Sequence, residues 1–249
     1  DFYSFLTGKL LPGRDNVLEV IAHNADQPNS RWYSGAGIYR PVTLWTAPAR
    51  HILPDGVQAR TLSIDPAEVE VTVQTTASGA VAVAILDGEQ TVATAQAESN
   101  GKAVLRVQIP NAKLWSPDSP ALYRCRAMFG DDCAETTFGV RTLSWGDDGF
   151  LLNGKRVILL GACVHHDHGV LGACCYPEAE ERKVRLLQKV GYNAVRCAHN
   201  PCSKAFLDAC DRLGMLVMDE YADMWYIHKT QYDYASYLPD RWRQDLESL

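Results

Sequence analysis

Short apolar runs alternate with amphipathic, helix-like segments between residues 157 and 218, and this order restricts the fold more than any other feature. The apolar runs cover residues 157–164, 192–197 and 215–218. The first helix-like segment begins at Pro177 and is followed by Gly191, and the second is followed by Gly214, which are typical helix-end signals. Two successive strand–helix–strand units predict a right-handed, parallel α/β arrangement.

The spacing of apolar residues places a buried face on each predicted element. The first apolar run is continuous, which predicts a strand covered on both faces. Each helix-like segment carries one apolar stripe. The stripe residues are Val184, Leu187 and Val190 in the first helix and Phe206, Leu207, Cys210 and Leu213 in the second. A closed barrel of eight such units needs about 250 residues. Residues 144–249 are therefore expected to hold only the first three βα units of a (β/α)8 barrel.

Residues 51–143 have the pattern of an antiparallel β-domain. Short alternating runs are separated by turn signals at 78–79, 87–88, 100–101 and 130–131. Strands at this spacing, with no helical periodicity, predict a small β-sandwich. No chemical motif stands out in it, so we interpret it as a packing domain. Residues 16–22 and 39–45 also alternate, and a polar loop separates them, so residues 1–48 are expected to be β-structure as well.

Composition excludes several classes of protein and favours a reducing environment. The net charge is −6 without a basic block, so nucleic acid is not an expected partner, and a membrane is not expected either. No apolar run approaches the roughly 18–20 residues of a membrane span. The eight cysteines form no CxxC pair, so a zinc site is not expected. We interpret them as free thiols and expect a bacterial cytoplasmic protein, although a chain that begins at Asp1 gives no information about export.

Polar side chains follow all three apolar runs, where strands of a parallel barrel carry their site. The first cluster is His165, His166 and Asp167, the second is Arg196, His199 and Asn200, and the third is Asp219 and Glu220. Arginine holds a carboxylate in a fixed fork, and histidine, asparagine and aspartate bind sugar hydroxyls. Trp225 could stack under a sugar ring. These nine residues are the predicted substrate site.

Each of these residues also has a structural interpretation, which the sequence leaves open. A histidine near a strand end is often structural, although three clusters at equivalent positions favour a site. Asp219 is suited to cap a helix or to pair with Arg196. Trp225 could be a packing residue. Cys163 and Cys197 lack a neighbouring base that would activate a thiol, so we interpret both as packing.

Several motifs, in the expected order, resemble family 2 of the glycoside hydrolases and in particular its β-galactosidase branch. The barrel motifs are Gly161-x-Cys-x-His165-His166-Asp167, Asn193-x-x-Arg196-x-x-His199-Asn200-Pro201 and Asp219-Glu220 followed by Asp223-Met-Trp225. Leu114-Trp115-Ser-Pro117 and Phe138-Gly-Val-Arg141 resemble the immunoglobulin-like middle domain. The stretch from Asn29 to Arg40 resembles the signature that closes an N-terminal, sugar-binding jelly roll. The resemblance implies three parts: the end of a jelly roll at 1–50, an immunoglobulin-like sandwich at 51–143, and the start of the barrel at 144–249.

The resemblance implies hydrolysis of terminal β-galactosides with retention, by two carboxyl groups about 5 Å apart. In the family the acid/base is a Glu that follows an Asn at the end of strand four, and this chain contains no Asn-Glu dipeptide. We therefore expect both catalytic carboxylates to lie beyond Leu249, and assign no catalytic residue here. His168 departs from the leucine common at its position in this branch.

Alternative functions and partners stay open from the sequence. β-Glucuronides and β-mannosides are the alternative substrates, and a carbohydrate-binding module without catalysis is the alternative class. No cofactor is required, but Mg²⁺ or Na⁺ could bind through Asp167, Asp219 and Glu220. Homo-oligomerisation of the full-length protein is a further open prediction.

Overall fold

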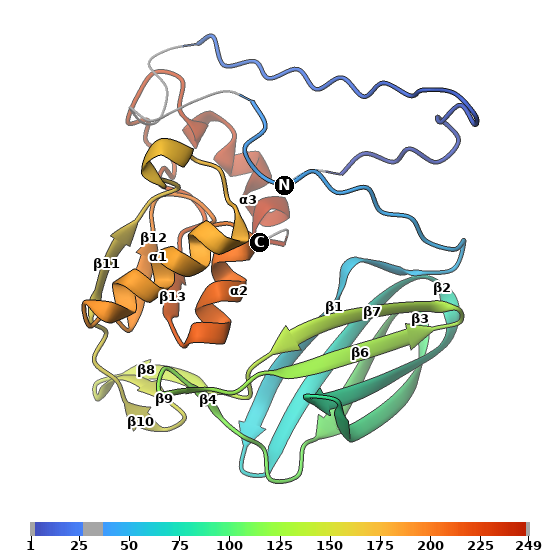
Figure 1. The fold of residues 1–249 in the computed structure, drawn as a ribbon, viewed down its shortest axis with the longest axis vertical. Coiled ribbons are helices and arrows are strands. Elements are labelled where there is room, and N and C mark those ends of the chain that lie inside the picture. Colours follow the sequence, from blue (N-terminus) through green and yellow to red (C-terminus); the bar gives the residue numbers. More distant parts are fainter. Residues whose placement is uncertain (1–2, 27–36, 248–249) are drawn as a thin grey trace.

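The computed structural model describes residues 3–26 and 37–247, which contain a β-sandwich and a parallel α/β unit joined by a small sheet (Figure 1). The sandwich strands are β1 (Ile52–Ile64), β2 (Ala67–Asp87), β3 (Gln90–Gln108), β6 (Tyr123–Phe129) and β7 (Asp132–Phe138). The connecting strands are β4 (Trp115–Ser116), β5 (Ser119–Pro120), β8 (Leu143–Gly146), β9 (Gly149–Leu152) and β10 (Lys155–Arg156). The α/β unit contains β11 (Gly161–Val164), α1 (Pro177–Lys189), β12 (Ala194–Cys197), α2 (Lys204–Leu213), β13 (Leu216–Asp219) and α3 (Leu238–Glu247). No helix among the described residues is long and apolar enough to cross a membrane.

The sandwich is built on one long, bent hairpin. Strands β2 and β3 pair along almost their whole length, and β2 also pairs with β1 and β6 in successive halves. Alternate residues of β2 point inward, so its valines line the core in both halves. The sheet order is β1-β2-β6-β7, with β3 on the free side of β2. The predicted β-sandwich is therefore present.

Two of the four predicted turns in this domain are not turns. The hairpins at 87–88 and 130–131 form as expected, between β2 and β3 and between β6 and β7. Ser78 instead pairs with Asn100, and Gly79 pairs with Ser99, inside the long hairpin. A register shift lies between Gln74 and Ser78. Glycine in a strand interior commonly marks a bulge or a bend, and here the two turn-like dipeptides lie opposite each other directly after the register shift.

The strands expected at residues 16–22 and 39–45 are not formed. Residues 3–26 and 37–50 contain neither helix nor strand. Val17 is 93% exposed, and the neighbouring Leu18 and Ile21 are also exposed. An alternating segment becomes a strand only when a neighbouring strand satisfies its backbone groups and covers its apolar face. Within the described residues no strand pairs with this segment, so the jelly roll remains a prediction, and most of its signature, residues 29–36, lies outside the described part.

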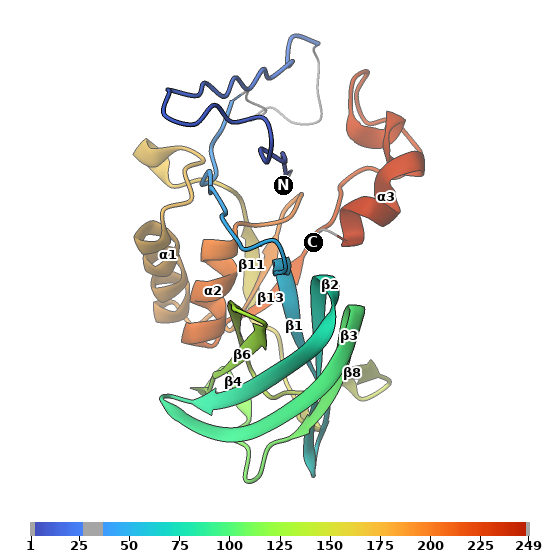
Figure 2. The ribbon, with the colours of Figure 1, turned by 90° about the vertical axis from the view of Figure 1, so that its right-hand side faces the viewer.

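The α/β unit follows the predicted order, with α1 and α2 side by side over one face of the three-stranded parallel sheet β11-β12-β13 (Figure 2). Gly191 follows the end of α1 with φ +93°, and Gly214 caps α2 with φ +82°. Val184, Phe206 and Cys210 are buried as predicted. Val190 is exposed instead, because it lies at the C-cap of α1 rather than on its inner face.

The first barrel strand is shorter and more exposed than the sequence predicts. Strand β11 begins at Gly161, and residues Ile158, Leu159 and Leu160 are exposed coil. Ala162 and Cys163 within the strand are exposed too. The prediction of a strand covered on both faces is wrong for this chain, because helices lie over only one face of the sheet and β11 is an edge strand. The uncovered face also carries Met218, which is exposed on β13.

Trp115 connects the sandwich to the α/β unit. Its side chain is fully buried, and it packs in one cluster with Leu152, Ala194 and Leu216. Its indole Nε1 donates a hydrogen bond to the carbonyl oxygen of Asp211 at 2.8 Å. A buried aromatic ring with a satisfied polar atom fixes both position and orientation. This contact sets the sandwich beneath the amino ends of the barrel strands, opposite the edge where the predicted site lies.

Gly214 lies at the closest approach between these two units, so its substitution by alanine should be destabilising. A Cβ atom there would lie 2.3 Å from the carbonyl oxygen of Pro117, and φ is +82°. The left-handed backbone alone costs an alanine about 1–2 kcal/mol, and we expect a total loss above about 2 kcal/mol. Gly88→Ala is the matched control, because Gly88 also has positive φ but open space around it. Urea unfolding measures both variants, and equal losses would contradict the contact with Pro117.

Candidate active site

The register of the parallel sheet aligns the ends of its three strands. Val164, Cys197 and Asp219 are neighbours across β11, β12 and β13. Because these are the last residues of their strands, the clusters at 165–167, 199–200 and 219–220 emerge along one edge, as predicted for a barrel site. One residue earlier in each strand, Cys163, Arg196 and Met218 are neighbours across the sheet, on the face that no helix covers.

Arg196 and Glu220 form the central ion pair of this edge. Nε of Arg196 donates to Oε1 of Glu220 at 2.6 Å, and Nη2 donates to the same oxygen. This hydrogen bonding raises the pKa of the Arg196 guanidinium. The remaining Nη1 donates to Sγ of Cys163 at 3.2 Å. Cys163 is exposed, so the packing interpretation of this thiol is wrong, and Arg196 is held from two neighbouring strands.

His199 lies between two carboxylates. Its Nδ1 is 3.4 Å from Oε2 of Glu220 and 3.7 Å from Oδ1 of Asp223. Asp223 was not predicted as a site residue, although the sequence places it in the motif that follows the third strand. Lys229 pairs with Asp223 at 2.7 Å. The arrangement gathers acidic and basic side chains at the ends of strands two and three.

Two further histidines link the first strand end to the second. Nδ1 of His165 lies 2.8 Å from the carbonyl oxygen of Ala198, and Nε2 of His166 lies 2.6 Å from Oδ1 of Asn200. Both acceptors are oxygens, so each of these ring nitrogens donates. The ring centroids of His165 and His199 are 5.4 Å apart. Arg196, Glu220, His199 and His165 therefore form one connected group, and His166 and Asn200 form a hydrogen-bonded pair beside it.

Burial lowers the pKa of His166 below its ordinary value of 6.5, outweighing the hydrogen bond to Asn200, which raises it. The folded state should therefore bind fewer protons than the unfolded state as pH falls through 6.5. We expect stability to decrease in that window as pH falls, and His166→Gln to weaken the decrease. Titration of the imidazole resonance that His166→Gln removes gives the folded pKa directly. A value at or above 6.5 would contradict the burial argument.

The other three predicted residues have different environments. Oδ1 of Asp167 accepts from the backbone N–H of Gly169 at 2.9 Å, which is a local turn contact. Oδ1 of Asp219 accepts from the backbone N–H of Cys202 at 3.1 Å. Asp219 is thus neither the partner of Arg196 nor the cap of α2, which is Ser203. Trp225 is 62% exposed, so it is not a core packing residue.

A Mg²⁺ or Na⁺ site through Asp167, Asp219 and Glu220 does not fit this geometry. Within residues 3–26 and 37–247, these three carboxylates do not form a group close enough to share one ion. All three also accept hydrogen bonds of their own, as described above. We therefore derive no chemical step through an oxygen-bound cation.

A buried acid that was not predicted from the sequence supports this edge from behind. Glu180 on α1 is 2% exposed, and its Oε2 lies 3.1 Å from Nε2 of His168 and 3.3 Å from Nζ of Lys183. Its Oε1 accepts from Oγ of Ser203 at 3.1 Å. Lys183 also donates to the carbonyl oxygen of His165. Only the i, i+3 spacing of Glu180 and Lys183 was visible in the sequence, because the other partners come from distant loops.

The segment before the sandwich also reaches the strand ends. Arg40 donates through Nη2 to the carbonyl oxygen of Pro201. The ring of Tyr39 lies 6.3 Å from that of His166. Both residues belong to the motif from Asn29 to Arg40, but they were not predicted to lie beside the barrel site. They show that the described part of this segment contacts the loop that carries His199 and Asn200.

Comparison with known proteins defines the class of the chain. Residues 144–235 match the family described as "Glycosyl hydrolases family 2, TIM barrel domain", and residues 56–141 match "Glycosyl hydrolases family 2". The β-galactosidase BoGH2A of Bacteroides ovatus is 37% identical over 98% of this chain and 31% of its own length. A putative β-glucuronidase of Formosa agariphila is 32% identical over 95% of this chain and 24% of its own length.

Solved structures agree with the sequence comparisons. A glycosyl hydrolase family 2 member from Bacteroides cellulosilyticus aligns with a TM-score of 0.77 and 36% identity, over 91% of this chain and 33% of that one. A β-glycosidase from Bacteroides vulgatus aligns with a TM-score of 0.75 and 30% identity, over 87% of this chain and 30% of that one. The chain belongs to family 2 of the glycoside hydrolases. Its sandwich is the immunoglobulin-like domain of that family and its α/β unit is the start of the barrel, and it spans about a third or less of these relatives.

Proposed function

We propose that the complete protein containing this chain hydrolyses terminal β-galactosides with retention, and that this chain supplies the first part of the sugar pocket. The cluster of Arg196, Glu220 and His199 at the strand ends carries the proposal, because it places charged and hydrogen-bonding groups at the functional edge of the barrel. Similarity to the β-galactosidase BoGH2A over nearly the whole chain supports it.

In this proposal the residues of the chain bind and orient rather than transfer protons. Arg196 donates two hydrogen bonds to Oε1 of Glu220, which fixes the direction of this carboxylate at the strand ends. His199, Asn200 and the strand-one histidines offer polar atoms to sugar hydroxyls. Trp225 offers an exposed indole face on which an apolar face of a sugar could stack.

The two carboxyl groups of the reaction are proposed to come from later barrel strands. One protonates the departing glycosidic oxygen while the other attacks the anomeric carbon. Water then enters, assisted by the first group acting as a base, and releases the sugar. The groups described above would hold the sugar in place during both steps.

The charges at the strand ends favour a neutral sugar over a uronic acid. A glucuronide carries a carboxylate, which a cation must neutralise. Among the described residues, the basic groups nearest this edge are already engaged. Arg196 pairs with Glu220, Lys229 with Asp223, Lys183 with Glu180, and Arg40 donates to a backbone carbonyl. Relatives named β-glucuronidase nevertheless keep β-glucuronides as the second candidate.

A panel of chromogenic β-galactoside, β-glucuronide and β-mannoside substrates, given to the complete protein, tests the proposal. We expect kcat/KM to be highest for the galactoside and to exceed that for the glucuronide by about 100-fold or more, since a mismatched charge leaves buried polar groups unpaired. Preference for the glucuronide would replace the proposed substrate. Galactose binding without turnover of any substrate, lost on His199→Ala, would instead establish a non-catalytic binding module.

A further inference from the structure

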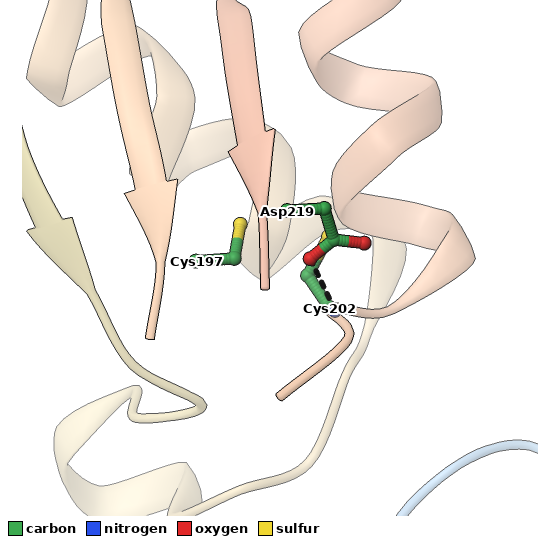
Figure 3. Close-up of side chains that lie close together, drawn as sticks. All are labelled: Cys197, Cys202 and Asp219. Carbon is green, nitrogen blue, oxygen red and sulfur yellow. Dashed lines mark hydrogen bonds between the residues drawn. The ribbon is translucent and has the colours of Figure 1, made fainter. Parts of the chain in front are cut away.

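Two cysteines and one carboxylate meet behind the ends of β12 and β13. The Sγ atoms of Cys197 and Cys202 and a carboxylate oxygen of Asp219 all lie within 4.8 Å of one another. Cys197 and Cys202 are buried, and Asp219 is partly buried. Figure 3 shows Cys197 at the end of β12, and Asp219 beside Cys202 with the hydrogen bond between these two residues drawn as a dashed line. No sugar-binding role was assigned to either thiol.

Strand pairing and a hydrogen bond within the group hold the three side chains in position. Cys197 and Asp219 are register partners in the parallel pair β12–β13. The N–H of Cys202 donates to Oδ1 of Asp219 at 3.1 Å, which ties the loop to the third strand. This bond uses one carboxylate oxygen as a hydrogen-bond acceptor and fixes the direction of the other. A preorganised group of this kind loses little conformational entropy when it binds a ligand.

Sulfur and carboxylate donors at this spacing suit a borderline-soft cation. A tetrahedral zinc ion with Zn–S bonds of about 2.3 Å holds two sulfurs roughly 3.8 Å apart. The observed upper limit of 4.8 Å requires only a small contraction. Two thiolates and one carboxylate exclude Mg²⁺ and Ca²⁺, which prefer oxygen donors alone. Three protein ligands leave a fourth position for water.

We propose that Cys197, Cys202 and Asp219 form a binding site for Zn²⁺ or a cation of the same class. The sequence did not predict it, because the cysteines are spaced C-x4-C and the third ligand comes from the next strand. An ion here joins the end of β12, the loop of residues 198–202 and the end of β13. That loop carries His199 and Asn200, so the ion would stabilise two residues of the sugar pocket without touching the sugar. The site is independent of the substrate proposed above.

Cobalt binding to the complete protein tests this site. The protein is stripped with a chelator, kept reduced with a phosphine, and titrated with Co²⁺, whose bonds to thiolates give a charge-transfer band in the near ultraviolet. We expect one equivalent of Co²⁺ to produce the band and Zn²⁺ to displace it. Cys202→Ser should abolish the band, and Asp219→Asn should weaken binding at least about tenfold.

Two other cysteines provide matched controls. Cys125→Ser changes a buried thiol of the sandwich, and Cys133→Ser changes an exposed one. Both variants should keep the band and its stoichiometry. Circular dichroism without metal confirms that each variant is folded, and Cys197→Ser replaces Cys202→Ser if the latter does not fold. Absence of a band in the wild type, or a band that survives Cys202→Ser and Cys197→Ser, would overturn the proposal.

Discussion

Replacing Arg196 with alanine in the complete protein is expected to lower kcat/KM for a β-galactoside by about 100- to 1,000-fold. Arg196 bonds Glu220 through two nitrogens and Cys163 through the third. Without Arg196, the Glu220 carboxylate loses the arginine that donates to it in the contacts described. Glu220 is then no longer held in place beside His199. Small displacements of positioning groups commonly cost about 100-fold in rate.

The control for this prediction is another arginine that forms an ion pair away from the strand ends. Arg185 on α1 pairs with Glu181 and is exposed, so Arg185→Ala should leave kcat/KM within about twofold of the wild type. Arg196→Lys keeps the charge but loses the fork, and should lie between wild type and Arg196→Ala. An unchanged kcat/KM for Arg196→Ala, in a protein that melts normally, would remove Arg196 from the site.

Replacing Glu180 with alanine is expected to destabilise the protein by about 3–5 kcal/mol. Glu180 is almost fully buried, and its two oxygens contact His168, Lys183 and Ser203. Removing one partner of a buried ion pair leaves uncompensated polar groups, which is the costly direction of change. Glu180→Gln keeps the shape and one acceptor, so its loss should be smaller.

Glu178→Ala on the same helix separates this effect from helix propensity and from the helix dipole. Glu178 lies in the first turn of α1 and is exposed. Its removal should cost under about 1 kcal/mol. Urea unfolding of Glu180→Ala, Glu180→Gln and Glu178→Ala gives the three values. Equal losses for the two alanine variants would mean that the buried network contributes nothing.

Local signals in the sequence were sufficient for the helices and their order. Pro177, Gly191 and Gly214 marked helix ends that the structure places within a residue or two. The parallel order followed from the handedness rule for strand–helix–strand units. The gathering of the strand-end clusters followed from the same topology, because parallel strands end at one edge.

Non-local pairing accounts for what the sequence could not predict. Ser78-Gly79 and Asn100-Gly101 look like turns locally. They are not turns, because they pair with each other inside one long hairpin. Apolar and polar residues alternate in residues 16–22, which would give a strand one apolar face. A strand needs a neighbour to pair with and to cover that face, and the described residues provide none. The contacts of Glu180 with His168 and Ser203, and of Cys202 with Asp219, join loops that are distant in sequence. Side chains brought together by loop geometry leave no periodic signal.

Hydrolysis of a chromogenic β-galactoside by the 249-residue chain, measured beside the complete protein that contains it, tests whether this chain holds the sugar without carrying out the reaction. We predict turnover by the complete protein and none by the chain alone, because the pocket residues described here would lack the two catalytic carboxyl groups. Turnover by the chain alone would contradict this account. It would assign the chemistry to carboxylates within the chain, with Glu220 and its neighbour Asp223 at His199 as the first candidates.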